Sequence, residues 1–245
     1  MTSVAAAVDE VLAAQRASGK PLAIILAGHN GSGKSTMWYR HLAPQIQIPL
    51  VNADRMMLSI LPEAPLPDWA TALRDDDESW MKVSQNGVQA FVAEALSKGV
   101  PFALETVFSH WKELPDGTFE SKIDQIVQMQ KAGYFVLLLF VGLANQMLSE
   151  ARVHTRVERG GHAVKADKLR DRFPRTQRAV RAALEVADAA VLVDNSRELR
   201  LAFSVCRVQQ KGDVLFDRRA SGETPPAILA WLDVVAPLEP EGEGG

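Results

Sequence analysis

Short, continuous apolar runs alternate along this chain with longer segments in which apolar residues recur every three or four positions. The short runs lack polar alternation, which is typical of strands buried on both faces of a parallel sheet. The longer segments have the period of helices that bury one face. We therefore expect strands at residues 22–27, 48–51, 101–104, 134–141 and 189–193, and helices at residues 4–16, 35–42, 79–98, 121–132, 144–158, 175–186 and 226–235.

Three stretches depart from this alternation. Residues 63–77 are rich in proline and acidic residues and are expected to form a surface loop. Residues 201–208 and 213–217 have the character of strands joined by a tight turn, which predicts a C-terminal β-hairpin. Residues 237–245 are acidic and rich in glycine, so we expect a disordered tail. The alternation of strands and helices predicts an α/β fold with a parallel, doubly wound sheet, in one domain over residues 1–236.

Composition and charge exclude several classes of protein. The chain has 245 residues, a net charge of −3 and a pI of about 6.0. A general nucleic-acid binder usually carries a clear basic excess, so no nucleic-acid partner is expected. Asp9 and Glu10 interrupt the first apolar stretch before any basic residue, and no apolar run reaches the length of a membrane span. A cytoplasmic protein without a membrane partner is therefore expected.

A glycine-rich loop stands between the first predicted strand and the helix after it. Its sequence, Gly-His-Asn-Gly-Ser-Gly-Lys-Ser over residues 28–35, matches the pattern G-x-x-x-x-G-K-[ST] in full. Glycines let backbone N–H groups converge on phosphate oxygens, and the start of a helix adds positive partial charge. Lys34 can reach the β- and γ-phosphates, and the Ser35 hydroxyl is the expected Mg²⁺ ligand. The sequence therefore predicts a P-loop NTPase fold that binds ATP or GTP with Mg²⁺ through Gly28, His29, Asn30, Gly31, Ser32, Gly33, Lys34, Ser35 and Thr36.

Two acidic residues follow predicted strands, at the edge where ligands of open α/β sheets bind. Asp54 follows the strand at 48–51, and Glu105 follows the strand at 101–104. Either carboxylate could accept a proton from an acceptor hydroxyl or hold Mg²⁺. The alternatives are that Asp54 caps a helix that begins at Arg55, and that Glu105 belongs to a buried ion pair.

A strongly basic segment follows in the second half of the chain. Between Arg152 and Arg181, ten lysines and arginines oppose three acids, so the segment carries about +7 and the rest of the chain about −10. Arginines that close over a transferring phosphate stabilise its charge, so we expect an arginine-rich lid at about 150–175, with freedom at Gly160-Gly161. The alternatives are a solvated helix face and an RNA-binding surface, which would have only Phe173 to stack on bases. The candidate phosphate ligands are Arg152, Arg156, Arg159, Arg170 and Arg172.

The ordered set of these motifs resembles the zeta-toxin family of P-loop kinases. The resemblance spans about residues 22–195. It implies transfer of the γ-phosphate of ATP or GTP to the 3′-hydroxyl of a UDP-activated amino sugar, typically UDP-N-acetylglucosamine. Members of the family often act as toxins that an antitoxin protein restrains. The residues that carry the resemblance are those of the loop at 27–36, Val-Asn-Ala-Asp at 51–54, Leu-Glu-Thr at 104–106, Arg-Val-His-Thr-Arg-Val at 152–157 and Gly-Gly-His-Ala-Val at 160–164.

The resemblance also implies roles for individual residues. Asp54 is similar in position to the base that accepts the sugar hydroxyl proton, and Arg156 to an arginine that stabilises the transition state. His162 stands where better-studied toxins place a second arginine, with Arg170 and Arg172 further along the chain. The chain is as compact as the short relatives that often lack a partner, so the resemblance does not imply toxicity.

The sequence thus favours a small-molecule kinase that acts on a UDP-amino sugar. A kinase of another hydroxyl, on a nucleoside, an antibiotic or a nucleic-acid end, is the alternative within the same class. A regulatory or binding module that hydrolyses ATP slowly is the alternative from a different class. It would release phosphate without any acceptor.

Overall fold

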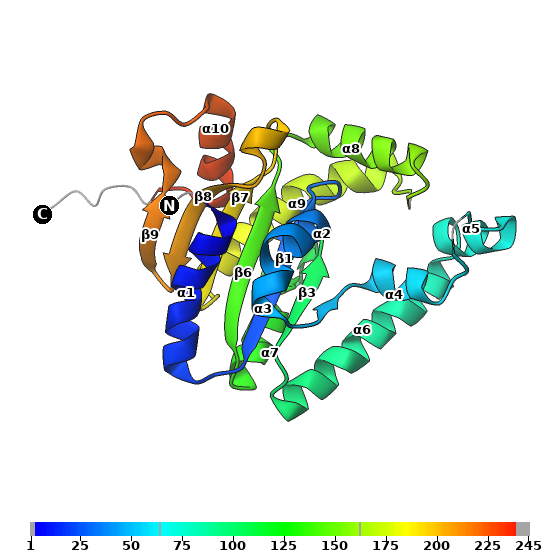
Figure 1. The fold of residues 1–245 in the computed structure, drawn as a ribbon, viewed down its shortest axis with the longest axis horizontal. Coiled ribbons are helices and arrows are strands. Elements are labelled where there is room, and N and C mark those ends of the chain that lie inside the picture. The colour runs from blue at the N-terminus through cyan, green and yellow to red at the C-terminus, as the bar shows by residue number, and fades with distance from the viewer. Residues whose placement is uncertain (1–2, 64, 162, 239–245) are drawn as a thin grey trace, which may run out of the picture.

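A seven-stranded sheet forms the centre of the molecule (Figure 1). The computed structural model describes residues 3–63, 65–161 and 163–238. The first five strands in the sheet are parallel and the last two are antiparallel, which confirms the predicted α/β fold with a C-terminal hairpin. In spatial order the strands are β2 (Leu50–Val51), β3 (Phe102–Thr106), β1 (Leu22–Gly28), β6 (Phe135–Gly142), β7 (Ala189–Asp194), β8 (Ser204–Gln210) and β9 (Asp213–Asp217).

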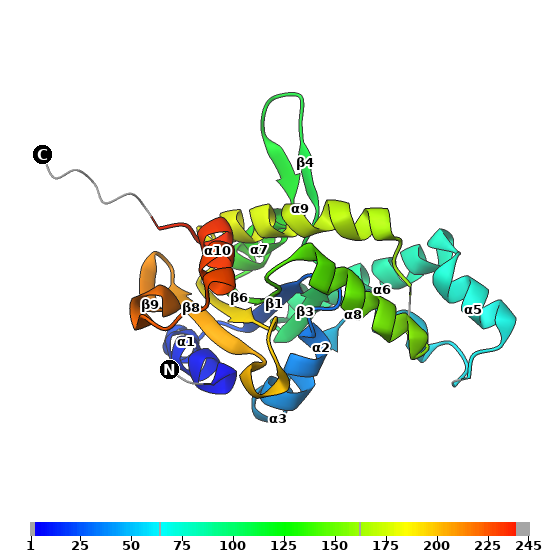
Figure 2. The ribbon, with the colours of Figure 1, turned by 90° about the horizontal axis from the view of Figure 1, so that it is seen from above.

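Helices cover both faces of the sheet, as Figure 2 shows from above. One face is covered by α1 (Val4–Ser18) and by the continuous helical segment of α2 (Lys34–Met37), the π-turn η1 (Trp38–Leu42) and α3 (Ala43–Ile46). The other face is covered by α6 (Glu78–Lys98), α7 (Ile123–Lys131), α9 (Ala166–Leu184) and α10 (Pro226–Val235). No helix in the described ranges has both the length and the apolar character needed to cross a bilayer.

The central strands are buried on both faces because their successive side chains enter different cores. In β1, Leu22, Ile24 and Leu26 pack under α1 and α2. Ala23 and Ile25 pack under the helices of the opposite face. This two-sided burial is the reason that the strand sequences show continuous apolar runs instead of polar alternation.

The sequence predicted most helices closely where clear caps stand at their ends. Asp77 accepts hydrogen bonds from the N–H groups of Ser79 and Trp80 and begins α6, and Gly99, with φ of +67°, ends it. Asn145 caps α8 (Gln146–Glu158) in the same way. Asx side chains at the N-cap and left-handed glycine after the last turn are both favourable, so these boundaries can be read from the sequence.

Four details of the sequence-based prediction are wrong. Residues 63–77 are not a continuous loop, because α5 (Asp68–Asp75) forms behind Pro67 and buries Ala70. Residues between β3 and α7 form a small hairpin of β4 (Trp111–Glu113) and β5 (Phe119–Ser121), whose three-residue strands are too short to show a period. The first strand of the C-terminal hairpin begins at 204 instead of 201, after a 3₁₀ turn.

The fourth wrong detail is the start of α9, which lies at Ala166 instead of about residue 175. Residue 175 directly follows Pro174, and proline removes a helical hydrogen bond and is disfavoured in a helix interior. Here Pro174 lies inside the helix, and buried Leu169 and Phe173 from the preceding turns compensate by packing on the protein. Tertiary packing therefore extends α9 across the basic segment.

We expect Gly142→Ala to lower the free energy of unfolding by about 1–3 kcal/mol through overpacking. A methyl group at Gly142 would lie 2.0 Å from Cζ2 of buried Trp231 in α10. Thermal unfolding followed by circular dichroism should show the loss as a lower Tm. The matched control is Gly212→Ala in the β8–β9 turn, where a methyl group would meet no atom within 4 Å. Equal melting of the two variants would contradict this packing.

Candidate phosphoryl-transfer site

The glycine-rich loop joins β1 to α2 at the carboxyl end of the parallel strands. Gly31 and Gly33 have φ of +71° and +87°, values that side chains rarely adopt. A methyl group at Gly28 would lie 2.5 Å from the carbonyl oxygen of Val141, so the loop passes close to β6. Lys34 Nζ donates hydrogen bonds to the carbonyls of Gly28 and His29, both at 3.1 Å. The loop therefore curls around its own lysine, which is the arrangement that cradles phosphate groups.

Two hydrogen bonds hold the loop from outside. Ser149 Oγ in α8 donates to the carbonyl of Asn30 at 2.7 Å. Asn195 Nδ2, just after β7, donates to the carbonyl of Ser32 at 2.8 Å. The sequence analysis missed both side chains, although Asn195 follows a predicted strand in the way that Asp54 and Glu105 do. These bonds link the loop to α8 and to the next strands of the sheet.

Ser35 and Glu105 meet at this edge of the sheet. Ser35 Oγ lies 2.9 Å from both carboxylate oxygens of Glu105, which stands beside Leu26 in the β1–β3 register. A hydroxyl and a carboxylate are the oxygen donors that Mg²⁺ binds beside nucleotide phosphates. The pair therefore fits the Mg²⁺ site that the sequence predicts at Ser35. The hydrogen-bond partner of Glu105 is a hydroxyl, but its charge also acts on buried Lys34, so both roles given for Glu105 stay predictions.

The pKa of Lys34 responds to the charges of the other predicted site residues. Burial lowers the pKa of Lys34, the carboxylates of Glu105 and Asp54 raise it, and the charge of Arg156 lowers it. The structure thus brings three residues from separate segments close enough to act on the loop lysine. The predicted lysine, two acids and arginine are thus related through their charges, and their roles stay predictions.

Asp54 does not cap a helix. It lies exposed in the first turn of α4 (Ala53–Ser59), and the cap is Asn52, whose side chain accepts a hydrogen bond from the N–H of Arg55 at 3.2 Å. The alternative role for Asp54 is therefore wrong. Its carboxylate stands free of the capping bond, where it can meet an acceptor hydroxyl.

The basic segment spans α8, which lies at the carboxyl edge of the sheet, and α9, which continues over one face of it (Figures 1 and 2). Arg152 and Arg156 of α8 and its C-cap residue Arg159 line a pocket of about 490 Å³ together with Gly160 and Gly161. A methyl group at Gly31 would lie 3.0 Å from Cβ of Arg152, so α8 packs directly on the loop.

The remaining candidates of the basic segment lie further along the chain. Arg170 Nε pairs with Glu150 at 3.3 Å and so joins α9 to α8. Arg172 is partly buried in α9. His162 lies outside the described residues. The charges of Arg172 and of the loop lysine, Lys34, both act on a residue that was not predicted from the sequence.

That residue is Lys122, which precedes α7. Its Nζ donates a hydrogen bond to Oγ1 of Thr106, the last residue of β3 and the neighbour of Glu105. Burial lowers the pKa of Lys122 to about 8, and the positive charges of Arg172 and Lys34 contribute to the decrease. The sequence carried no signal for it, because a lysine after a short hairpin is ordinarily a solvated surface residue.

His29 has a structural role that the loop motif does not reveal. Its side chain is buried, stacks on Phe173 of α9 at 3.9 Å between ring centroids, and contacts Phe140 of β6 edge-on at 5.5 Å. Neither ring nitrogen has a hydrogen-bond partner among the described residues. The ring of His29 joins the loop to α9. If His29 contacts the nucleotide as predicted, it does so through its backbone N–H.

We expect His29 to make folding sensitive to acid. Burial, and then the nearby charge of Lys34, lower the pKa of His29 from 6.5 to about 3. Between these values the unfolded chain binds a proton that the folded protein excludes, so this stability is present above pH 6.5 and is lost as the pH falls toward 3. Lowering the pH from 7 to 5 should therefore cost about 2 kcal/mol through this group.

Urea unfolding at both pH values measures this loss. In His29→Gln the dependence on pH should weaken by that amount, whereas His154→Gln, which alters an exposed histidine of α8, should keep the wild-type dependence. Identical dependence in the wild type and in His29→Gln would show that His29 titrates normally.

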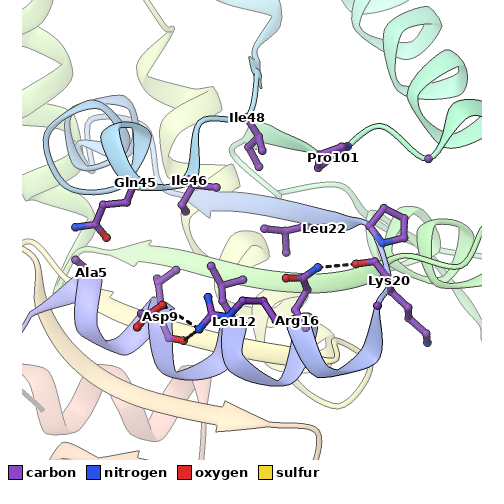
Figure 3. Close-up of a pocket in the computed structure, with 15 residues that line it drawn as sticks. Ala5, Asp9, Leu12, Arg16, Lys20, Leu22, Gln45, Ile46, Ile48 and Pro101 are labelled. Carbon is purple, nitrogen blue, oxygen red and sulfur yellow. Dashed lines mark hydrogen bonds and ion pairs between the residues drawn. The ribbon is translucent and has the colours of Figure 1, made fainter.

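A second pocket, of about 580 Å³, lies at the opposite end of β1 (Figure 3). It is bounded by Leu12 and Arg16 of α1, by Ile46 and Ile48, and by Pro101 before β3. Ligands of open α/β sheets bind at the carboxyl ends of the strands. This pocket is at the amino ends, and no residue of the predicted site lines it. This pocket is therefore separate from the candidate site around Lys34.

Comparison with known proteins gives a family and a fold. The family model described as zeta toxin matches residues 6–220. An uncharacterized protein of Haemophilus influenzae is 27% identical over 152 residues, which are 62% of this chain and 91% of that protein.

Two solved structures share the fold. One comes from the PezAT chromosomal toxin-antitoxin system of Streptococcus pneumoniae, with a TM-score of 0.53 and 15% identity over 98% of this chain and 90% of that chain. The other is the AvrRxo1-ORF1:-ORF2 complex with ATP, with a TM-score of 0.54 and 11% identity over 97% of this chain and 70% of that chain.

Proposed function

This chain belongs to the zeta toxin family and is a P-loop phosphotransferase, and we propose that it transfers the γ-phosphate of ATP or GTP to a hydroxyl of a UDP-amino sugar such as UDP-N-acetylglucosamine. The observation that carries the proposal is the curled loop around Lys34 with the bonded pair of Ser35 and Glu105 next to it, and the charges of Asp54, Glu105 and Arg156 all act on the pKa of Lys34. A loop that only bound nucleotide would not need an exposed acid beside its lysine. The acid and the lid arginine support transfer to a hydroxyl.

The proposed step is an in-line displacement at the γ-phosphorus. The acceptor oxygen bonds to phosphorus, the bond to the β–γ bridging oxygen breaks, and the nucleoside diphosphate leaves with that electron pair. The acceptor proton goes to the carboxylate of Asp54, which acts as general base. Lys34 and the loop N–H groups hold the β- and γ-phosphates. Mg²⁺, when held by Ser35 and Glu105, supplies positive charge against the phosphate oxygens.

We propose that residues 150–175 act as a lid over this step. Arg156, with Arg152 and Arg159, would stabilise the charge on the transferring phosphate. Arg74 Nη1 of α5 donates to the carbonyl of Gly160 at 2.9 Å, which ties the turn of the lid to the segment after Asp54. This bond supports the proposal, because it joins the turn after α8 to a helix on the other side of Asp54 in the chain from the loop.

The acceptor is tested by measuring nucleoside diphosphate release with and without candidate acceptors. Mg·ATP and Mg·GTP are each supplied with UDP-N-acetylglucosamine, uridine or buffer alone. We expect release to rise only with the UDP-sugar. Equal release in buffer alone would support a slow nucleotide hydrolase instead, and a response to another hydroxyl would keep the kinase and change its acceptor.

A protein partner is a separate proposal. The PezAT structure is of a toxin-antitoxin system, and its likeness to this chain is one of fold. We propose an antitoxin partner that covers the site and restrains transfer. Expression of the chain alone in a bacterial host should then arrest growth, and Lys34→Ala should abolish the arrest. Normal growth with active wild-type enzyme would contradict the need for an antitoxin.

A further inference from the structure

Two backbone hydrogen bonds of a Schellman motif close the carboxyl-terminal end of α8. Gly160, with φ of +82°, directly follows the C-cap residue Arg159, and its N–H donates to the carbonyl of Val157 at 2.9 Å. The N–H of Gly161 donates to the carbonyl of Arg156, also at 2.9 Å. These bonds satisfy carbonyl groups that the end of a helix leaves without a partner. The last turn of α8, which carries Arg156, therefore depends on the glycine turn formed by Gly160 and Gly161.

The glycine turn also fixes the course of the Arg156 side chain. A methyl group at Gly161 would lie 2.6 Å from Cγ and 3.2 Å from Cδ of Arg156, and 2.9 Å from its carbonyl oxygen. Only a residue without a side chain lets the stem of the arginine pack this closely on the turn. The charge at the end of this stem acts on Lys34 of the loop, whose pKa it lowers. The position of the glycine turn therefore affects the position of the arginine charge.

Arg74 of α5 holds the glycine turn from another segment of the chain, next to the end of α8 (Figures 1 and 2). Its Nη1 donates to the carbonyl of Gly160 at 2.9 Å. Its Nε and Nη2 donate to the two carboxylate oxygens of Asp75 at 2.9 and 2.7 Å, and only 10% of its side chain is exposed. A charged donor is favourable at this carbonyl, because the carboxyl-terminal end of a helix carries negative partial charge.

One peptide unit joins Arg74 to Arg156. The carbonyl of Gly160 and the N–H of Gly161 belong to the same planar group. The carbonyl accepts a hydrogen bond from Arg74, and the N–H donates one to the carbonyl of Arg156. Because the unit is planar, and because a bond at one end polarises the group and strengthens the bond at the other, Arg74 acts on the helical turn that carries Arg156.

We infer that Arg74 is a positioning residue for phosphoryl transfer, which acts through the glycine turn to hold Arg156 against the transferring phosphate. The inference rests on the proposed function. Arg74 lies in the segment that follows Asp54 and α4, so the segment that carries the proposed base also holds the arginine of the lid. A second contact between α6 and the lid, from Lys168 to Glu78 at 3.2 Å, is an exposed ion pair and contributes little.

A double-mutant cycle on ADP release from Mg·ATP, with UDP-N-acetylglucosamine present, tests the inference. We expect Arg74→Met to lower kcat by about tenfold to a hundredfold, the effect of a small displacement of a group that stabilises the transition state. In an Arg156→Gln background the same change should alter kcat less than about twofold, because Arg74 acts through Arg156. Affinity for Mg·AMP-PNP should also change less than about twofold. Arg74→Lys should retain more activity than Arg74→Met, since it keeps a charged donor.

Amide hydrogen exchange of the Gly161 N–H, followed by NMR, is a readout that needs no turnover. It should be about tenfold faster in Arg74→Met than in wild type, because the peptide unit loses its charge-assisted bond. Glu78→Gln is the matched control, because it removes the exposed contact between α6 and the lid. It should keep the wild-type kcat and the wild-type exchange of Gly161.

The outcomes separate this inference from the proposed function. Unchanged kcat or unchanged Gly161 exchange in Arg74→Met overturns the inference, and so does an equal loss of kcat in the wild-type and Arg156→Gln backgrounds. If ADP forms without a phosphorylated sugar, and its rate depends on Arg74 only through Arg156, the inference stands and the proposed acceptor is wrong. A wild type that forms no ADP would contradict the proposed function and the inference together.

Discussion

Asp54→Ala is expected to lower kcat for phosphoryl transfer about a thousandfold, the usual effect of losing a positioned general base. Affinity for Mg·ATP should stay within about threefold, because the loop and Lys34 bind the nucleotide without Asp54. The charge of Asp54 acts on Lys34, but its carboxylate is exposed and forms no cap, so its loss should leave the fold intact. Steady-state kinetics with ATP and UDP-N-acetylglucosamine, together with nucleotide titration, measure both quantities.

The matched control for Asp54→Ala is Asp68→Ala. Asp68 is also an exposed aspartate in the first helical turn, in the neighbouring α5. It should retain wild-type kcat. If Asp54→Ala turns over as fast as Asp68→Ala, the base is another residue, and Glu105 is then the next acid to replace.

Lys34→Met is expected to reduce kcat/KM by about a thousandfold or more. The ammonium of Lys34 is buried and held by two loop carbonyls, so its replacement removes the positive charge that the loop itself positions. Unlike Asp54→Ala, this change should also weaken nucleotide binding, since it removes a charge from the β- and γ-phosphates.

Stability distinguishes loss of chemistry from loss of fold in Lys34→Met. Burial disfavours the charged form of Lys34, as its lowered pKa shows, so methionine should not lower Tm. Lys20→Met, at an exposed position before β1, is the control for losing one positive charge. Retention of more than about a tenth of wild-type kcat/KM by Lys34→Met would contradict the assigned role of the loop.

The sequence predicted the sheet because burial of β1 and β6 on both faces requires continuous apolar runs. The prediction from sequence was wrong or silent where tertiary packing outweighs the local conformational preference of the chain. The predicted helix began only after Pro174, at residue 175, yet α9 starts at Ala166 and Phe173 within it stacks on His29. The short hairpin before α7 could not be predicted from period, since each of its strands has three residues.

At the candidate site, too, residues marked by a local motif could be predicted and residues placed by long-range contacts could not. Lys34, Asp54 and Glu105 were found because a motif and two strand ends mark them. Asn195 and Lys122 were missed because their contacts join residues that are distant in the chain, and no local pattern records such contacts. The motif likewise carried no sign that the side chain of His29 is a core residue.

The central claim is that this chain moves the γ-phosphate to the hydroxyl of an acceptor. ³¹P NMR of Mg·ATP with UDP-N-acetylglucosamine follows donor, product and free phosphate in one sample. We predict a new phosphomonoester resonance that grows in step with ADP for wild type and is absent for Asp54→Ala and Lys34→Ala. ADP that forms together with inorganic phosphate alone, at the same rate with and without the UDP-sugar, would contradict the claim.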